Sequence, residues 1–584
     1  MASDVKISRR TVVMLTLLAF VPYLNALRAG FTLDDVPTVR NNPAVSRGVD
    51  LMGILSSPLP PMENLYRPFT VLTYAVNEQL APENAAAFHA VNIILHTAIT
   101  ILVLLTAARL FESYWVGILA AMLFAVHPIH TEAVTSIVGR AELLVAFFGL
   151  TAMLTAARSD RSTHRWSRLA FELLSVTSYF LALFSKESAV TLLPLIVLFR
   201  IVCRKEALST GLATEFRSLT WVPYALGTVL FIVCRYHVVG SVALGNNLTP
   251  LDNALGFVPW DVRLRSALGV LWDYFGLLNV PLVLSADYSY HQVPLVNSWL
   301  DARFLAGSAL LSIAALVVVS PVRPAVKLAV ALPFIALSLT TNLLFPIGTI
   351  KGERLLYVPS VGWVLLAAYA FERMLNIRRY RALAAGALVL IVTTFAVRTW
   401  MRNYDWRDDP TLFAITSRNS PDSAKAHYNF GVALQNKGAL AEAVAEYQEA
   451  LTIASWTEGA AFGMGVISEK SGHIAAAVRW YQQALDIAPD YDEAHTNLCH
   501  VLFNTEQFAA AAAACRAGLR YKPADANLLK GLGASLVALG DTEKGIELLR
   551  RSLALNTRDH ELQIYVARLE RTSAESATEA VGVE

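Results

Sequence analysis

The chain has 584 residues, of which 55% are hydrophobic and only 16% are charged, and its mean hydropathy is +0.46. A typical soluble domain carries about 25% charged residues, so this composition excludes a purely soluble protein and a disordered one. The formal net charge of +2 gives no basis for nucleic-acid binding through bulk charge. Four cysteines are too few for a disulfide scaffold or a cysteine-rich metal domain.

Long apolar runs are concentrated in the first 400 residues, and a membrane-spanning helix needs about 20 mostly apolar residues. The sequence therefore predicts eleven spans, at 11–29, 86–107, 114–126, 142–157, 169–184, 188–202, 219–234, 303–320, 325–342, 355–372 and 382–399. A twelfth run, 266–283, contains Asp273 and two glycines. We expect this run to lie in the membrane interface or to re-enter the membrane rather than to cross it.

Basic residues predict the orientation, because cytoplasmic loops of membrane proteins carry an excess of Lys and Arg. Lys6, Arg9 and Arg10 precede the first span and place the N-terminus in the cytoplasm. With eleven spans, five further loops lie on the cytoplasmic side, and all five are basic. Their basic residues are Arg109, Arg158, Arg161, Arg165, Arg168, Arg204, Lys205, Arg217, Arg323, Lys327, Arg373, Arg378, Arg379 and Arg381. We expect the first span to be an uncleaved anchor and the C-terminal region to lie outside the cytoplasm.

A 34-residue period runs through residues 424–571. Four positions repeat at this spacing: Gly431, Gly465, Cys499 and Gly533; Ala443, Ala477, Ala511 and Gly545; Tyr447, Tyr481, Cys515 and Leu549; and Ala450, Ala484, Gly518 and Ser552. This period, with small residues where two helices cross, is typical of tetratricopeptide repeats. We therefore predict such repeats, followed by a capping helix at 559–571.

Tetratricopeptide arrays bind peptides or proteins in a concave groove. The alternative is that these repeats only dimerise or brace the membrane domain. Cys499 and Cys515 occupy packing positions of one repeat. We interpret them as small core residues rather than as a disulfide or a metal-binding pair.

Five groups of ionisable residues fall on the predicted non-cytoplasmic side, where a charge beside the membrane needs a specific explanation. The first group is Asp34-Asp35, directly after the first span. Two adjacent carboxylates suit a general base, since one can deprotonate an acceptor while the other orients it, although a helix cap is the alternative. The second is Arg67, at the start of an amphipathic helix that ends at Leu80.

The third group runs from His127 to Glu142. If this segment is one helix, Glu132, Ser136 and Arg140 share one face at a spacing of four residues. His127, His130 and Glu132 are residue types that bind metals, but their spacing is not that of a zinc motif. We therefore expect no metal site here.

The fourth group, Lys186-Glu187, lies in a tight turn and either snorkels to the interface or meets an anionic lipid head. The fifth contains Glu353 and Arg354 with Tyr357, and a cation at this depth suits a phosphate. Together the five groups surround one pocket beside the bilayer with carboxylates, cations and histidines. This chemistry fits a lipid-phosphate donor whose tail stays in the membrane.

The motifs resemble those of the transmembrane and tetratricopeptide-repeat O-mannosyltransferases, which are GT-C glycosyltransferases related to the protein O-mannosyltransferases. The residues that carry the resemblance are Asp34-Asp35, Asn41-Asn42-Pro43, Tyr66-Arg67-Pro68-Phe69-Thr70, Phe88-His89, Asn92, Leu95-His96, 127–134, 139–144, Lys186-Glu187, 345–348 and 353–357. The resemblance implies an all-α chain. Its parts would be a polytopic GT-C-type transmembrane domain at 1–400, a linker at 401–423, the repeats with their capping helix at 424–571 and a disordered tail at 572–584.

The resemblance also implies an activity, the inverting transfer of mannose or another hexose from a polyprenyl-phosphate carrier to Ser or Thr of an exoplasmic protein. The base would be Asp34 or Asp35, with a slight preference for Asp35. The donor phosphate would be bound by Arg67, Arg140, Lys186, Arg354 and Tyr357. The sugar and acceptor would be bound by His127, His130, Glu132, Glu142, Glu187 and Glu353. No cofactor is implied, since the cations make a divalent metal unnecessary at the leaving phosphate.

Two other functions stay open on the sequence alone. One is a GT-C transferase that glycosylates a lipid or a cell-wall polymer, and the other is a non-catalytic, membrane-tethered repeat scaffold. An alanine-rich composition with Arg preferred over Lys favours a bacterial inner membrane, with periplasmic repeats and an undecaprenyl carrier. In a eukaryote the corresponding location would be the endoplasmic reticulum membrane with lumenal repeats.

Overall fold

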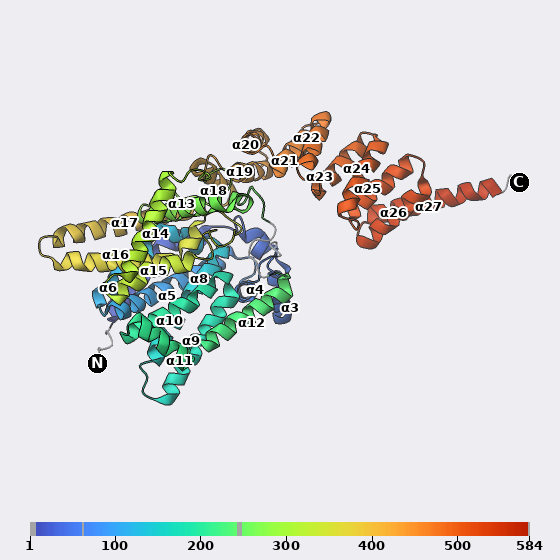
Figure 1. Ribbon diagram of the computed structural model, residues 1–584. Coiled ribbons are helices and arrows are strands. Elements are labelled where there is room, and N and C mark those ends of the chain that lie inside the picture. Colours follow the sequence, from blue (N-terminus) through green and yellow to red (C-terminus); the bar gives the residue numbers. More distant parts are fainter. Residues whose placement is uncertain (1–6, 61–63, 242–247, 582–584) are drawn as a thin grey trace. The chain divides into compact units, whose positions relative to one another are not determined.

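The computed structural model describes residues 7–60, 64–241 and 248–581, and these residues form helices, turns and loops without a β-strand (Figure 1). The expected all-α fold is therefore confirmed for the described chain. The structure divides into two compact units, Met1–Ser423 and Ala424–Glu584. Lys6, part of the predicted N-terminal basic cluster, and the last three residues of the predicted tail lie outside the described residues.

The α-helices of the first unit are α1 (Arg9–Phe20), α2 (Pro43–Ser46), α3 (Leu51–Ser56), α4 (Pro68–Leu80), α5 (Ala85–Phe111), α6 (Tyr114–Val126), α7 (Thr131–Thr135), α8 (Arg140–Ser159), α9 (Arg165–Ser185), α10 (Leu192–Arg204), α11 (Leu208–Ser218), α12 (Val222–Val239), α13 (Trp260–Asn279), α14 (Ala302–Val319), α15 (Pro324–Leu337), α16 (Pro359–Asn376), α17 (Arg381–Asp405) and α18 (Asp409–Asn419). Shorter or tighter helical segments join them: η1 (Val21–Arg28), η2 (Val36–Arg40), η3 (Pro128–His130), η4 (Ile137–Gly139), η5 (Glu187–Thr191), η6 (Ala254–Phe257) and η7 (Glu353–Leu356).

Among the described residues, seven helical segments are long and apolar enough to cross a membrane. They are Arg9–Arg28, α5, Ile137–Ser159, α9, α12, α14 and α17. An eighth is obtained if α6 and Pro128–Thr135, which meet at an angle of 54°, form one broken span. Pro128 explains the break, because proline cannot donate the backbone hydrogen bond that would continue α6. These segments identify a multi-pass membrane chain.

The sequence predicts eleven spans, three more than the eight obtained when the broken span is counted. The three additional predicted spans correspond to α10, α15 and α16. α10 has 13 residues and α15 has 14, which is shorter than the hydrocarbon core requires. α16 has 18 residues but carries Glu372 and Arg373, which reduce its hydropathy. α13, which covers most of the run 266–283, is not among the candidate spans either.

Helix α8 lies at the centre of the first unit. It packs against α5, α9 and α10, and most of its apolar residues from Leu143 to Ala157 belong to the largest hydrophobic core. Gly149 allows the close approach of α10, since a Cβ there would lie 2.8 Å from Leu192. The N-terminal end of α8, with Arg140 and Glu142, is therefore held in a fixed position by the surrounding helices.

Residues 401–423, which the sequence predicts as a linker, contain the end of α17 and helix α18. The Asp408 side chain accepts a hydrogen bond from the Thr411 N–H at 2.9 Å and so caps α18. Trp406, between the two helices, is fully buried. This segment is compact and belongs to the first unit.

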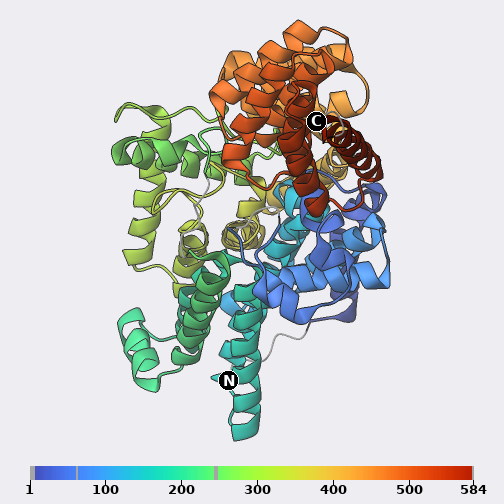
Figure 2. The same ribbon diagram turned by 90° about the vertical axis from the view of Figure 1, so that its right-hand side faces the viewer.

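The second unit is an array of paired helices that follow one another in chain order (Figure 2). Its helices are α19 (Ala424–Asn436), α20 (Leu440–Ile453), α21 (Glu458–Lys470), α22 (Ile474–Ile487), α23 (Asp492–Asn504), α24 (Phe508–Tyr521), α25 (Ala526–Ala538), α26 (Thr542–Leu555) and α27 (His560–Val581). Glycine is needed within the pairs, because a Cβ at Gly431 or Gly465 would lie 2.6 Å from Tyr447 or Tyr481. The capping helix predicted at 559–571 is the first part of α27.

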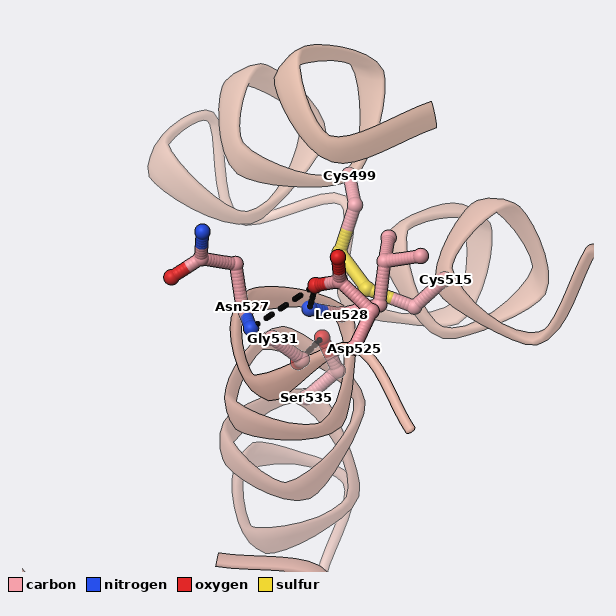
Figure 3. Close-up of a disulfide and its surroundings, with 7 residues drawn as sticks. All are labelled: Cys499, Cys515, Asp525, Asn527, Leu528, Gly531 and Ser535. Carbon is pink, nitrogen blue, oxygen red and sulfur yellow. Dashed lines mark hydrogen bonds between the residues drawn. A yellow bond between two sulfur atoms is a disulfide. The ribbon is translucent and has the colours of Figure 1, made fainter. Parts of the chain in front are cut away.

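The third pair replaces this glycine–tyrosine contact with a covalent bond. Cys499 of α23 and Cys515 of α24 form a disulfide, with their Cα atoms 5.4 Å apart (Figure 3). The interpretation of these cysteines as unlinked core residues is therefore wrong. Positions 16 residues apart face each other within a helix pair, which brings the two Cα atoms within disulfide range. Gly531 of α25 covers the bridge, since a Cβ there would lie 2.7 Å from the Cys499 sulfur.

We expect the Cys499→Ala/Cys515→Ala double variant to reduce the free energy of unfolding of the repeats by about 3 kcal/mol. The physical reason is that a bridge with a sequence separation of 16 lowers the conformational entropy of the unfolded chain. Thermal unfolding of the full-length protein by circular dichroism, with and without reductant, measures this effect. Cys203→Ala, at a free cysteine, is the control. Identical unfolding of wild type and the double variant without reductant would contradict the prediction.

Candidate functional site

Several helix ends meet around one cavity of about 200 Å³ in the first unit. The segments that reach it come from parts of the chain that are far apart in sequence: the turn after η1, the start of α4, the start of α8, the α9–η5 turn and η7. The charged side chains that line the cavity are Asp34, Arg67, Glu142, Lys186, Glu187 and Arg354. Each of them was a predicted site residue, and the structure brings the six together.

The two adjacent aspartates have different surroundings. Asp34 lines the cavity, its side chain is 28% exposed, and its Oδ2 lies 3.3 Å from Nη1 of Arg354. Asp35 is fully buried and accepts hydrogen bonds from the Val138 N–H at 2.9 Å and the Thr32 N–H at 3.3 Å. Burial raises the pKa of Asp35 to about 7, although these backbone hydrogen bonds oppose the rise. Asp34 is thus accessible from the cavity, whereas Asp35 holds the backbone around η4.

Arg354 connects Asp34 to a second acid. Its backbone N–H donates to Oε2 of Glu132 at 2.8 Å, and its Nε lies 3.5 Å from the other oxygen of the same carboxylate. Glu132 lies on α7 and is almost completely buried. Burial alone would lower the pKa of Arg354, but the two carboxylates raise it above its usual value. The guanidinium therefore stays charged at the wall of the cavity.

The other two cations of the cavity are also paired. Lys186 donates to Glu142, and the Nη2 atom of Arg67 lies 3.0 Å from Oε2 of Glu187. Burial lowers the pKa of Lys186 below its usual value, against the opposing charge of Glu142. Burial would raise the pKa of Glu187, but Arg67 and then Arg235 lower it below its usual value. The cavity thus contains three cations and three carboxylates.

Arg140 does not line this cavity. It is fully buried, and it donates to the side chains of Asn92 at 2.9 Å and Asn77 at 3.0 Å, with its guanidinium 4.9 Å from the Tyr74 ring. It therefore ties the start of α8 to α4 and α5. These contacts are those of a structural residue beside the site.

Glu132, Ser136 and Arg140 do not lie on one continuous helix, so the shared face that a single helix would give them is not formed. α7 ends at Thr135, Ser136 is extended and η4 precedes α8. The turn is tight, since a Cβ on Gly139 would lie 2.2 Å from the Ala133 carbonyl oxygen. The break separates Glu132, which contacts Arg354, from Arg140, which contacts α4 and α5.

The histidines and Tyr357 are fully buried away from the cavity lining. Nε2 of His127 lies 3.0 Å from the Leu278 carbonyl oxygen, and Nε2 of His130 lies 2.8 Å from the Ser360 hydroxyl. The Tyr357 hydroxyl lies 2.8 Å from Nδ1 of His96. Within the described residues, no three His, Cys, Asp or Glu side chains are placed to hold a metal ion.

Glu353 lies behind the cavity wall. It is fully buried, accepts a hydrogen bond from the Tyr288 hydroxyl at 2.8 Å and lies 3.7 Å from the buried Arg402. Burial raises its pKa to about 7. Glu353 therefore anchors η7, which carries Arg354, to α17 and the 280–296 loop.

Sequence reasoning missed Arg402 and Arg235, although a charged residue within an apolar helix is a recognisable signal.

Two smaller cavities lie beside the charged one along α8. A cavity of about 10 Å³ shares Glu142, Ser188, Thr340 and Leu355 with it. A further cavity of about 10 Å³ shares Val358 with the second. The residues that line this last cavity are all apolar: Ala146, Gly149, Leu150, Met153, Leu192, Leu195, Leu332, Val358 and Val361. The residues around the site are therefore charged at the N-terminal end of α8 and apolar farther along α8, where it faces α10, α15 and α16.

Comparisons with known proteins agree with both parts of the chain. Two tetratricopeptide-repeat family models match residues 411–458 and 469–536. The chain is 30% identical over 449 residues to a Homo sapiens protein named protein O-mannosyl-transferase TMTC3, covering 71% of this chain and 48% of that protein. It is 30% identical to Homo sapiens protein O-mannosyl-transferase TMTC1, covering 74% and 54%, and 27% identical to Caenorhabditis elegans protein O-mannosyl-transferase F38B6.6, covering 76% and 63%.

These relatives confirm the resemblance to the transmembrane and tetratricopeptide-repeat O-mannosyltransferases. The chain spans about half the length of the curated relatives it matches. Among solved structures, it is similar to MamA from Desulfovibrio magneticus RS-1, with 22% identity, a TM-score of 0.25 and coverage of 27% of this chain and 89% of that one.

We expect Asp35→Asn to become more stable relative to wild type as the pH rises from about 4 to about 7. A carboxyl whose pKa is raised to about 7 by folding binds its proton more tightly in the folded chain, so wild type loses stability over this interval. Asparagine cannot ionise and avoids this loss. Thermal midpoints at pH 5 and pH 8 measure the difference, with the surface N-cap variant Asp50→Asn as control. If the thermal midpoints of Asp35→Asn and wild type differ by the same amount at both pH values, the raised pKa of Asp35 is contradicted.

Proposed function

We propose that the protein is a membrane glycosyltransferase. It transfers mannose, or another hexose, from a polyprenyl-phosphate carrier to Ser or Thr hydroxyls of exoplasmic proteins, with inversion at the sugar carbon. One observation carries the proposal: a cavity that holds an accessible carboxylate, Asp34, together with three cations, and that lies beside apolar residues of α8, α10, α15 and α16. The names of the relatives support mannose as the sugar and protein as the acceptor.

Asp34 is the proposed general base. Its carboxylate takes the proton of the acceptor hydroxyl as the hydroxyl oxygen forms a bond to the anomeric carbon of the sugar. The bond between that carbon and the phosphate oxygen breaks, and its electron pair leaves with the phosphate. The products are the O-glycoside and the polyprenyl phosphate, and Asp34 then returns its proton to solvent. A single displacement of this kind inverts the configuration.

Arg354, Lys186 and Arg67 are the proposed donor ligands, because cationic N–H groups form strong hydrogen bonds to phosphate oxygens. The leaving phosphate gains negative charge in the transition state, so fixed cations stabilise the transition state more than the ground state. Glu142 and Glu187 are placed to accept hydrogen bonds from sugar hydroxyls. Apolar side chains beyond Leu355, such as Val358, lie beside these groups, on the side where the apolar chain of the carrier would lie.

The disulfide between Cys499 and Cys515 supports a location for the repeats outside the cytoplasm, since such bonds persist in oxidising compartments. We place the repeats in the periplasm of a bacterium, or in the lumen of the endoplasmic reticulum in a eukaryotic host. Tetratricopeptide repeats bind peptide segments, which favours a protein acceptor over a lipid or a cell-wall polymer.

We expect Asp34→Asn to lower the rate of sugar transfer at least about 100-fold, because a general base contributes a factor of this order or more. Purified protein, radiolabelled polyprenyl-phosphate mannose and a set of secreted-domain proteins provide the assay, with alkali-labile label on protein as the readout. Asp35→Asn is the matched control and retains transfer. Full activity of Asp34→Asn would refute its role, and selective loss in a folded Asp35→Asn protein would move the base to the neighbouring residue.

We expect a chain that ends at residue 423 to lose transfer to protein acceptors while still releasing sugar from the donor. The residues of the catalytic cavity all precede this point, whereas the repeats that would recruit the acceptor follow it. The same radiolabel assay, with separate analysis of protein, lipid and water-soluble fractions, measures the change. Label in a lipid product, with or without the repeats, would instead support the glycolipid alternative.

A further inference from the structure

Each of the three cations proposed to bind the donor forms an ion pair with a carboxylate of the same cavity. Arg354 lies 3.3 Å from Asp34, Arg67 lies 3.0 Å from Glu187, and Lys186 donates to Glu142. A phosphate that binds here needs the same N–H groups. It therefore competes with the carboxylates, and it also repels them as a like charge in a partly desolvated cavity.

The three pairs differ in how strongly they are held. Glu187 has a second cation, Arg235, at 3.5 Å, and Glu142 is almost completely buried. Asp34 is 28% exposed, and Arg354 is the one cation that lies within ion-pair distance of it among the described residues. The pair between Asp34 and Arg354 is consequently the one that a phosphate can most easily separate.

Arg354 has an anchor that does not depend on Asp34. Glu132 accepts a hydrogen bond from its backbone N–H and lies 3.5 Å from its Nε. The Nη1 atom, which faces Asp34, can therefore change partner while the rest of the residue stays in place. Glu132 is a positioning residue for Arg354 in this arrangement.

We propose that the donor phosphate and Asp34 compete for Arg354, so that donor binding releases the carboxylate that acts as the base. The inference rests on the proposed function and adds an order of events to it. While Nη1 donates to Asp34 Oδ2, that oxygen is engaged and is less available to an acceptor hydroxyl. Once the phosphate takes the N–H group, the oxygen becomes available beside the bound sugar. The acceptor is then deprotonated only when a donor is present.

The test measures binding of undecaprenyl phosphate, which carries no sugar and cannot react, to the full-length protein in detergent. Asp34→Asn removes the competing charge but keeps the shape of the side chain. We expect it to bind about two- to fivefold more tightly than wild type, the range for loss of one partly exposed ionic competitor. Asp35→Asn, whose carboxyl does not line the cavity, is expected to bind like wild type. Arg354→Gln is expected to bind at least about tenfold more weakly.

Unchanged or weaker binding by a folded Asp34→Asn protein overturns the competition and leaves the proposed function standing. Failure of wild type to bind undecaprenyl phosphate, by contrast, overturns the proposed donor and the competition together. A second measurement avoids the variant. Carbodiimide coupling of an amine, read by mass spectrometry, should label Asp34 more in the presence of undecaprenyl phosphate than in its absence, with Asp35 unchanged. Equal or reduced labelling of Asp34 by wild type with bound lipid phosphate overturns the competition.

Discussion

The charged side chains that line the cavity of the first unit are paired with opposite charges, because an unpaired charge outside water costs several kcal/mol. This constraint determines how the site is built. Lys186 follows α9 and pairs with Glu142 at the start of α8, and Arg67 at the start of α4 pairs with Glu187. The ion pairs hold the helix ends in register and, at the same time, collect the groups that a charged ligand needs.

Much of the architecture is predictable because its signals are periodic or local. The 34-residue spacing predicts the helix pairs of the second unit, and the apolar runs predict helices in the first. The cavity residues were also identified from sequence, since a charge such as Lys186 or Arg354 next to an apolar run stands out. Span number was less predictable, because α10 and α15 are apolar but too short to cross alone.

Other features depend on contacts that local sequence does not contain. Asp34 and Asp35 are neighbours in the chain, and their roles differ through tertiary contacts: the Val138 N–H donates to the buried Asp35, whereas Asp34 pairs with Arg354. The repeat pattern predicts that Cys499 and Cys515 lie close together, but not that they are bonded. The equivalent positions of the preceding repeat, Gly465 and Tyr481, are in contact without a covalent bond. Arg140 resembles a phosphate ligand in sequence, yet it donates to two asparagine side chains and two backbone carbonyl oxygens.

The disulfide of the third repeat has a mechanical consequence. Solenoid repeats contact mainly their neighbours, so under tension they unravel one after another. The segment from Cys499 to Cys515 is a closed loop and cannot be drawn out while the bridge is intact. At about 3.4 Å for each extended residue, the loop withholds roughly 50 Å of chain length. An unfolding motor or a protease that threads the chain would therefore meet a two-stranded obstacle in the middle of the array.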